Sequence, residues 1–473
     1  MKRKSFIMAA LTSFIAFSSF PTFAAKPIDV LVIDSGSDFT HKELNPMAKP
    51  NVAELNGKAN VDDDKNGYID DIYGWNFVEN NSTIVNLKDT PPEYDKVISV
   101  MKDINKMQQF GQAAFSRQEW MNFMMLYNNP SIKPWVNFCG GWAHGTHCAG
   151  IIASNNKNIA FKAIRHIPTG SAPSRLVENA LKRISYKISQ RTNKTKLTME
   201  EIESYFDELG KEYAAQIKSR GEYIAKFNPR LINCSFGTQN ANVLIMIKQN
   251  MTQWGFENPS SDEIQEMANL FVKKTMFPRD KAFYGGCKNA LIFIAAGNTT
   301  EDLDKITTSP QGVPIENKIV VAATNDNQMM ASFSCYGKNN VDVAVPGVNI
   351  YATYPNNKMG YMSGTSMACP NALGMASLVL TENPGLTPVQ LKKILMETVD
   401  KKAWLKEKVK SGGVINVERA VYAAKQIKAG KSMTEAIKEA KTKISDMPTK
   451  RDKKVGCDLS DPTVKQIYFS NVY

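Results

Sequence analysis

The chain has 473 residues, of which 43% are hydrophobic and 22% charged, and it carries a formal net charge of +12. This apolar content is ample for a packed core, and α/β enzymes often place 250 or more residues in one core, so we expect one catalytic domain with insertions. A basic surface favours acidic partners or nucleic acid, but the lysines are scattered and no nucleic-acid motif accompanies them, which argues against nucleic-acid binding.

The first residues are typical of a targeting segment. Basic residues at positions 2–4 precede an apolar run over 6–20, and small residues suit cleavage after Ala24 or Ala25. A membrane anchor is the alternative, but the run is shorter than the roughly 20 residues that span a bilayer, and no later run is longer. We therefore expect a signal peptide over 1–25 and a secreted or periplasmic protein without stable membrane insertion.

The next stretch, Lys26 to Asp38 (KPIDVLVIDSGSD), predicts a short apolar strand that ends in Asp34. A carboxylate at a strand end is a candidate for orienting a catalytic histidine. His41 follows a few residues later and is interpreted as a core or turn histidine.

A glycine turn at Gly67 is rich in carboxylates. Asp62, Asp64, Asn66 and Asp70 imitate the first half of a calcium loop, in which alternating oxygen ligands surround the cation. The bidentate Glu that ends such a loop is missing. These four residues are therefore candidate calcium ligands, with a solvated acidic turn as the favoured alternative.

Residues 86–138 form a first insertion, whose methionines and aromatic residues recur at helical spacing and predict helices. It leads into His144 to Gly150 (HGTHCAG), where His144 is the candidate base. His147 is assigned a packing role, because the His-x-x-His spacing lacks the glutamate of zinc peptidases.

Downstream, a strand is predicted over Ala160 to Ile164 and a helix near Ser174 to Ile188. A second insertion, residues 190–228, is charged and amphipathic, and Thr198 with Glu201 resembles a helix start. Further helices are predicted within 239–290, from Val417, and from about Gly430 to Ile444, followed by an irregular tail.

The block Gly364 to Pro370 (GTSMACP) places Ser366 between a glycine turn and an apolar helix predicted over Asn371 to Leu380. Pro370 suits the first turn of a helix. A serine there lies near unpaired backbone N–H groups that can stabilise an oxyanion. A helix-capping serine is the alternative, and the blocks around Asp34 and His144 favour a nucleophile because they complete the set of acid, base and serine.

The order Asp34, His144, Ser366, with these flanking residues, closely resembles the subtilisin-like serine peptidases. Two supporting blocks, Leu231 to Thr238 (LINCSFGT) and Leu291 to Asn298 (LIFIAAGN), resemble the substrate-pairing strand and the oxyanion strand of that family. The resemblance implies an α/β fold, a three-layer sandwich with a mostly parallel central sheet and helical insertions. On this basis the catalytic domain covers 26–425, with insertions at about 86–138 and 190–228 and a C-terminal extension at 426–473.

The resemblance also implies a serine endopeptidase acting on peptides or proteins. His144 would take the proton of Ser366, Asp34 would orient the imidazole, and Asn298 would bind the oxyanion beside the Ser366 N–H. Substrate-binding residues implied in the same way are Ser235, Phe236 and Gly237, which would pair with an extended peptide, and Ala295, Ala296 and Gly297, which would form one wall of the primary pocket. The chemistry requires no cofactor.

Two other functions are considered. A catalytically silent homologue could bind peptides or envelope components in the same cleft, but the intact Asp34, His144, Ser366 and Asn298 argue against it. An esterase or lipase is disfavoured because Ala368 breaks the Gly-x-Ser-x-Gly pattern. The chain also departs from the family at Asn371, where relatives commonly have His. In addition, only a few residues separate the expected signal peptide from Asp34, too few for the prodomain that usually precedes the catalytic core.

The seven cysteines are an odd number, so at least one thiol is free or pairs between chains. Cys148, Cys234 and Cys369 lie inside the catalytic blocks, where small buried side chains are expected. The four remaining cysteines could form one or two disulfides in an oxidising compartment; they are Cys139, Cys287, Cys335 and Cys457.

Overall fold

The computed structural model describes residues 26–169, 182–183, 185–186, 189–190 and 196–447. The predicted signal peptide, most of the helix predicted near 174–188 and the last part of the C-terminal extension lie outside the described residues.

The centre of the molecule is an eight-stranded sheet with the order β2-β1-β3-β4-β5-β6-β10-β9. Neighbouring strands are parallel throughout, except for the antiparallel pair β9 and β10 at one edge. The strands are β1 Ile28–Asp34, β2 Ile159–Arg165, β3 Leu231–Cys234, β4 Leu291–Ala295, β5 Lys318–Thr324, β6 Val343–Pro346, β9 Asp400–Lys401 and β10 Gly413–Val414. This sheet confirms the predicted mostly parallel α/β fold.

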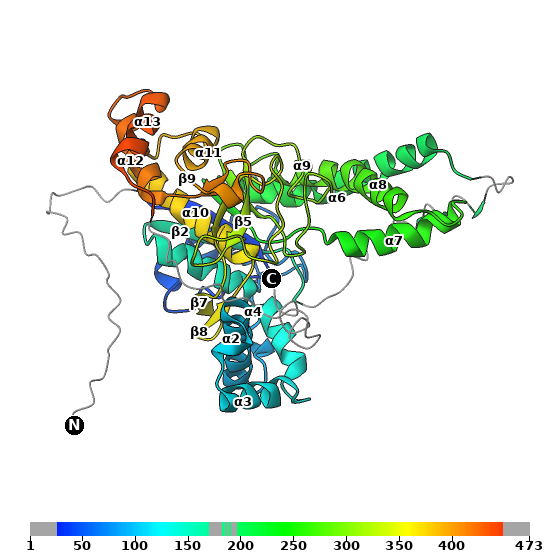
Figure 1. Cartoon of the computed structure of the whole chain (residues 1–473), viewed down its shortest axis with the longest axis horizontal. Helices are drawn as coiled ribbons and strands as arrows, with labels where there is room; N and C mark the ends of the chain where they lie inside the picture. The colour runs from blue at the N-terminus through cyan, green and yellow to red at the C-terminus, as the bar shows by residue number, and fades with distance from the viewer. Residues whose placement is uncertain (1–25, 170–181, 184, 187–188, 191–195, 448–473) are drawn as a thin grey trace.

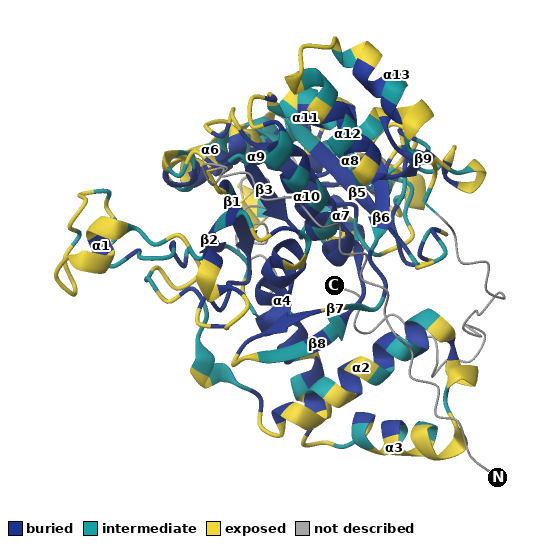
Figure 2. Ribbon diagram, turned by 90° about the vertical axis from the view of Figure 1, so that its left-hand side faces the viewer, coloured by how far each residue is buried: buried dark blue, intermediate teal, exposed yellow. Residues whose placement is uncertain are grey.

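Helices cover both faces of the sheet, because its central strands are apolar on both sides. Along β1, Val30 and Val32 point into one hydrophobic core, and Leu31 and Ile33 point into a second core on the other face. The first core is completed by α4 (Lys133–Asn155), α10 (Thr365–Glu382), α11 (Pro388–Glu397) and α12 (Val417–Lys428), and the second by α6 (Met199–Lys226) and α9 (Phe277–Tyr284). The three predicted layers are therefore present (Figure 2).

The first insertion is helical, as predicted. It contains α2 (Tyr94–Phe110) and α3 (Arg117–Tyr127), and it continues without a break into α4, the helix that carries His144. Helix α2 packs against the hairpin of β7 (Ile350–Tyr354) and β8 (Lys358–Met362), below the main sheet in Figure 2. Asn105 on α2 accepts a 2.6 Å hydrogen bond from the Ser363 hydroxyl, so the insertion contacts the segment that leads to Ser366.

The second insertion and the residues after β3 form a helical arm that extends from the sheet (Figure 1). The arm comprises α6, α7 (Asn240–Gln253), α8 (Ser261–Phe271), a π-helical turn at Val272–Met276 and α9. It has a separate hydrophobic core that includes Phe206, Trp254 and Phe271. Thr198 and Glu201 form the expected capping box at the start of α6.

The C-terminal helices pack onto the catalytic layers. Helix α13 (Met433–Lys443) lies against α12, and the buried Arg419 on α12 donates to the carbonyl of Ile444 and the carboxylate of Asp446. The part of the predicted extension up to residue 447 is therefore docked on the domain. Shorter elements are α1 (Val52–Asn56) and the 3₁₀ turns Asn45–Met47, Leu87–Asp89, Gln112–Ala114 and Ala403–Leu405.

Among the described residues, no helix combines the length and apolar character that crossing a bilayer would require. Cys139, Cys287 and Cys335 are free, buried thiols, so the expected disulfide does not join any two of them. Cys457 lies outside the described residues. Cys148, Cys234 and Cys369 are buried, as the catalytic blocks led us to expect.

Candidate active site

Ser366 is the second residue of α10, close to the carboxyl end of the neighbouring parallel strands. The predicted start of this helix was wrong: the helix begins at Thr365, and Pro370 lies in its second turn. Since proline has no N–H, the carbonyl of Ser366 receives no hydrogen bond from Pro370. It instead accepts hydrogen bonds from the Ser235 hydroxyl at 3.0 Å and the Cys148 thiol at 3.5 Å.

His144 and Asp34 form a buried hydrogen-bonded pair. The imidazole Nδ1 lies 2.7 Å from the Asp34 carboxylate, which also accepts the Ser35 N–H at 2.7 Å. A carboxylate can only accept, so Nδ1 donates, and in the neutral imidazole Nε2 is the acceptor nitrogen. The pair can form because Gly145 lets α4 approach the loop after β1: a Cβ there would lie 2.1 Å from the Gly36 carbonyl oxygen.

The protonation of the two histidines on α4 differs. Burial lowers the pKa of His144, but the charge and hydrogen bond of Asp34 outweigh this and hold the pKa well above its usual value. Burial without such a partner lowers the pKa of His147 to about 3. His147 lies against the carbonyls of Ile350 and Gly360, which agrees with its predicted packing role. His41 is also buried and contacts the Lys358 carbonyl.

One thiol contacts both candidate catalytic residues. The Cys148 sulfur lies 4.0 Å from His144 Nδ1 and 3.5 Å from the Ser366 carbonyl oxygen. Burial raises the pKa of Cys148 to about 11, so the thiol is neutral and acts as a packing group. This contact is part of a larger packing of α4 against α10, two helices that are far apart in sequence. The Ser366 hydroxyl itself donates to the Ser235 carbonyl at 3.2 Å.

Asn298 is held next to the start of α10. Its side-chain oxygen accepts hydrogen bonds from both the backbone N–H and the hydroxyl of Thr365, each at 2.9 Å. The Thr365 hydroxyl also accepts the Gly297 N–H at 3.0 Å. Because the amide oxygen is occupied in this way, the amide nitrogen is the donor that Asn298 can offer to a bound group.

The predicted substrate-binding segments leave the sheet side by side. Ser235, Phe236 and Gly237 follow β3, whereas Ala296 and Gly297 follow Ala295 at the end of the adjacent parallel strand β4. Ser235, Ala295 and Ala296 are buried, and Phe236 and Gly237 are more exposed. Both segments contact the start of α10: the Ser235 carbonyl accepts the Ser366 hydroxyl, and the Gly297 N–H donates to the Thr365 hydroxyl. A buried glutamine, Gln311, contacts both segments, and sequence reasoning missed it.

The acidic loop differs in part from the prediction. Carboxylate oxygens of Asp62 and Asp64 lie within 4.8 Å of each other and of Glu54 on α1, a residue that sequence reasoning missed. Asn66 donates its amide to Asp64, and Asp70 accepts the Asn60 N–H. Carboxylate oxygens are the donors that calcium prefers, so these three residues are candidate ligands. The Glu54 oxygens also accept the backbone N–H groups of Asp63, Asp64 and Asp70.

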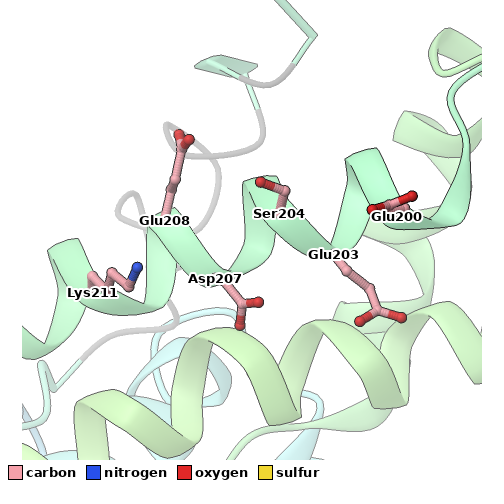
Figure 3. A pocket seen from close by; sticks show the side chains of 6 residues that line it. All are labelled: Glu200, Glu203, Ser204, Asp207, Glu208 and Lys211. Atoms are coloured by element: carbon pink, nitrogen blue, oxygen red, sulfur yellow. The ribbon is translucent and has the colours of Figure 1, made fainter.

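A separate surface pocket of about 550 Å³ lies on the helical arm (Figure 3). It is lined by side chains of α6, most of them acidic, and includes none of the residues above. The lining residues are Glu200, Glu203, Ser204, Asp207, Glu208 and Lys211.

Comparison with known proteins identifies the family. The model of the subtilase family matches residues 26–416, which is most of the chain. The chain belongs to the subtilase family. This subtilase is 25% identical over 418 residues to "Subtilisin-like protease 1" of Plasmodium vivax, an alignment covering 85% of this chain and 48% of the relative. The corresponding protein of Plasmodium falciparum is 26% identical over 84% of this chain and 43% of its own length.

Other similarities are shorter or structural. A "Thermophilic serine proteinase" of a Bacillus strain is 36% identical over 25% of this subtilase and 27% of its own length. The crystal structure of a cold-adapted subtilisin-like serine proteinase superposes with a TM-score of 0.40 and 19% identity, covering 83% of this chain and 88% of that one. The chain spans about half the length of the curated Plasmodium relatives that it matches.

Proposed function

We propose that this subtilase is an exported serine endopeptidase that hydrolyses peptide bonds through Asp34, His144 and Ser366. The observation that carries the proposal is the buried 2.7 Å contact between His144 Nδ1 and Asp34, made beside the helix start that presents Ser366. Membership of the family and the similarity to proteins named subtilisin-like proteases support the same activity. The substrate is a peptide or protein.

The reaction would proceed in two halves. The Ser366 oxygen forms a bond with the scissile carbonyl carbon while His144 Nε2 takes the hydroxyl proton. The C–N bond then breaks, and the same nitrogen delivers that proton to the leaving amine. In the second half, water attacks the acyl-enzyme, and His144 again transfers the proton, which restores the serine. Asp34 stays ionised and stabilises the imidazolium.

The negative oxygen of the tetrahedral intermediate would be bound by two donors. One is the backbone N–H of Ser366, which lies in the first turn of α10, where backbone N–H groups have no acceptor within the helix. The other is the side-chain nitrogen of Asn298, oriented by the two hydrogen bonds from Thr365. Such preorganised donors lower the barrier because they need no rearrangement during the reaction.

An extended substrate would pair with the backbone of Ser235, Phe236 and Gly237 as an added strand. Its side chain before the scissile bond would point between this segment and the wall formed by Ala295, Ala296 and Gly297. Both walls leave the carboxyl ends of adjacent parallel strands, the usual edge for ligand binding in α/β sheets.

We also propose that calcium binds to the loop around Gly67. The carboxylates of Asp62, Asp64 and Glu54 support this, with Asn66 and Asp70 as the other predicted ligands. The ion would fix the loop and α1 and takes no part in the chemistry. The N-terminal signal-like segment supports export of the enzyme, secreted or periplasmic.

A serine-directed fluorophosphonate probe tests the peptidase proposal. We expect the probe to label the wild-type protein and not Ser366→Ala, because only an activated serine oxygen attacks the phosphorus. In the wild type, the rate of peptide hydrolysis should decrease as the labelled fraction of the protein increases. Equal absence of labelling in both proteins, with intact folding by circular dichroism, would instead favour the catalytically silent homologue.

A further inference from the structure

Gln311 lies in the loop between β4 and β5, and its side chain is anchored inside the protein. Only 3% of the residue is exposed, and its side-chain nitrogen donates to the Ala295 carbonyl oxygen at 2.7 Å. Its backbone carbonyl accepts a hydrogen bond from the Lys318 ammonium group. The amide is therefore held at the wall that contains Ala295.

The same amide also touches the opposite wall. A Cβ placed on Gly237 would lie 2.3 Å from the Gln311 side-chain nitrogen and 2.8 Å from its side-chain oxygen, so the amide group is in contact with Gly237. The absence of a side chain at Gly237 provides the space that the amide fills. The amide thus bridges the gap between the two segments that would receive the substrate.

We propose that Gln311 closes the primary pocket, so that this enzyme accepts only small residues, Gly, Ala or Ser, before the scissile bond. The inference rests on the proposed peptidase function, because it assigns the substrate class of that site. A side chain that enters between the two walls meets the Gln311 amide. Leu or Phe would need the volume that the amide occupies, and close-packed interiors yield little space without strain.

The Gln311 amide is only partly satisfied. Its side-chain oxygen is buried and has no hydrogen-bond partner among the described residues. Buried amides normally use their acceptor as well as their donor, so this group does not belong to a fully connected structural network. Replacing it with Ala removes one hydrogen bond together with an unsatisfied acceptor, and we therefore expect the variant to fold.

The experiment compares peptides that differ only in the residue before the scissile bond, namely Ala, Ser, Leu and Phe. For the wild type we expect kcat/KM for Ala to exceed that for Phe by about 100-fold or more, since pocket misfit discriminates on this scale. The Gln311→Ala variant should raise the ratio of kcat/KM for the Phe peptide to kcat/KM for the Ala peptide at least about tenfold. Gln311→Met is the matched control: it keeps the length of the side chain, so the preference for Ala should persist.

The outcomes separate this inference from the peptidase proposal. If the wild type reacts with the fluorophosphonate probe and cleaves Leu or Phe peptides better than Ala peptides, the closed pocket is wrong and the peptidase stands. An unchanged Phe/Ala ratio in folded Gln311→Ala also overturns it. Should that variant not fold, the wild-type profile alone decides. If the wild type neither reacts with the probe nor cleaves any peptide, the peptidase proposal itself fails.

Discussion

The close passage of α4 over the end of β1 predicts that Gly145→Ala separates Asp34 from the candidate base His144. A Cβ at this position would lie 2.1 Å from the Gly36 carbonyl oxygen and 2.9 Å from the Asp34 Cβ. Ordinary contacts between carbon and a carbonyl oxygen begin at about 3.3 Å. The two obstructing atoms are a backbone oxygen and a Cβ, and neither can move aside by a side-chain rotation. The helix and the loop must therefore move apart by roughly 1 Å.

Such a shift acts directly on the candidate catalytic pair. His144 precedes Gly145 on the same helix, and its 2.7 Å contact with Asp34 would lengthen beyond hydrogen-bonding distance. A misplacement of about 1 Å costs on the order of 10²-fold in rate, so we expect kcat/KM to fall by about that factor. Loss of the Asp34 contact also removes the cause of the raised His144 pKa, so the rise of activity with pH should move to lower pH.

The matched control is Gly150→Ala on the same helix. Its Cβ would meet the Thr353 hydroxyl at 2.2 Å, a comparable overlap that points toward β7 and away from Asp34. Both variants should lose stability by about 1–3 kcal/mol, measured by denaturant unfolding. Only Gly145→Ala should show the shifted pH profile. If it keeps kcat/KM within about threefold of the wild type, or if both variants lose activity equally with unchanged pH profiles, the reasoning is refuted.

In wild type, activity should increase with pH through a pKa well above 6.5, because His144 must be neutral to accept the serine proton. An activity plateau already reached at pH 6 would contradict this prediction. The stability that the protonated His144 contributes is fully present below its unfolded pKa of about 6.5, and it is lost as pH rises through the folded pKa. Asn298→Ala should lower kcat by about 10²- to 10³-fold with little change in KM, and hydrolysis at the wild-type rate would remove Asn298 from the oxyanion site. A chelator should lower the melting temperature and added calcium restore it, with a smaller response in Glu54→Gln; a response of equal size in that variant would exclude Glu54 as a ligand.

Local patterns were sufficient for most of the fold. Short segments of sequence predict the buried strands β1, β3 and β4 and the capping box at Thr198, and the structure confirms them. The start of α10 was misjudged because Pro370 looks like a first-turn proline, whereas hydrogen bonds to Asn298 and the packing around Ser366 extend the helix one turn and more toward its N-terminus. Tertiary contacts decided that boundary.

The residues that sequence reasoning missed make contacts with residues distant in sequence, and no local motif marks them. Glu54 stands on a short helix before the acidic loop, and nothing in its flanking residues marks it as part of that cluster. Gln311 follows Ser309-Pro310 in a loop with no motif, and only its burial between Gly237 and Ala295 draws attention to it. Gly237, in the segment after β3, was the sole available signal, because an absent side chain leaves room for another.

The helix that presents Ser366 lacks one internal donor, since Pro370 cannot bond to the Ser366 carbonyl. That carbonyl depends on a hydroxyl from the end of β3 and a thiol from α4. The position of Ser366 is therefore coupled to two distant segments, the end of β3 and α4, and the Cys148 thiol also lies 4.0 Å from Nδ1 of the His144 imidazole. We expect a change at Ser235 or Cys148 to displace Ser366, and with it to alter the proposed turnover, although Asp34, His144 and Ser366 themselves are kept.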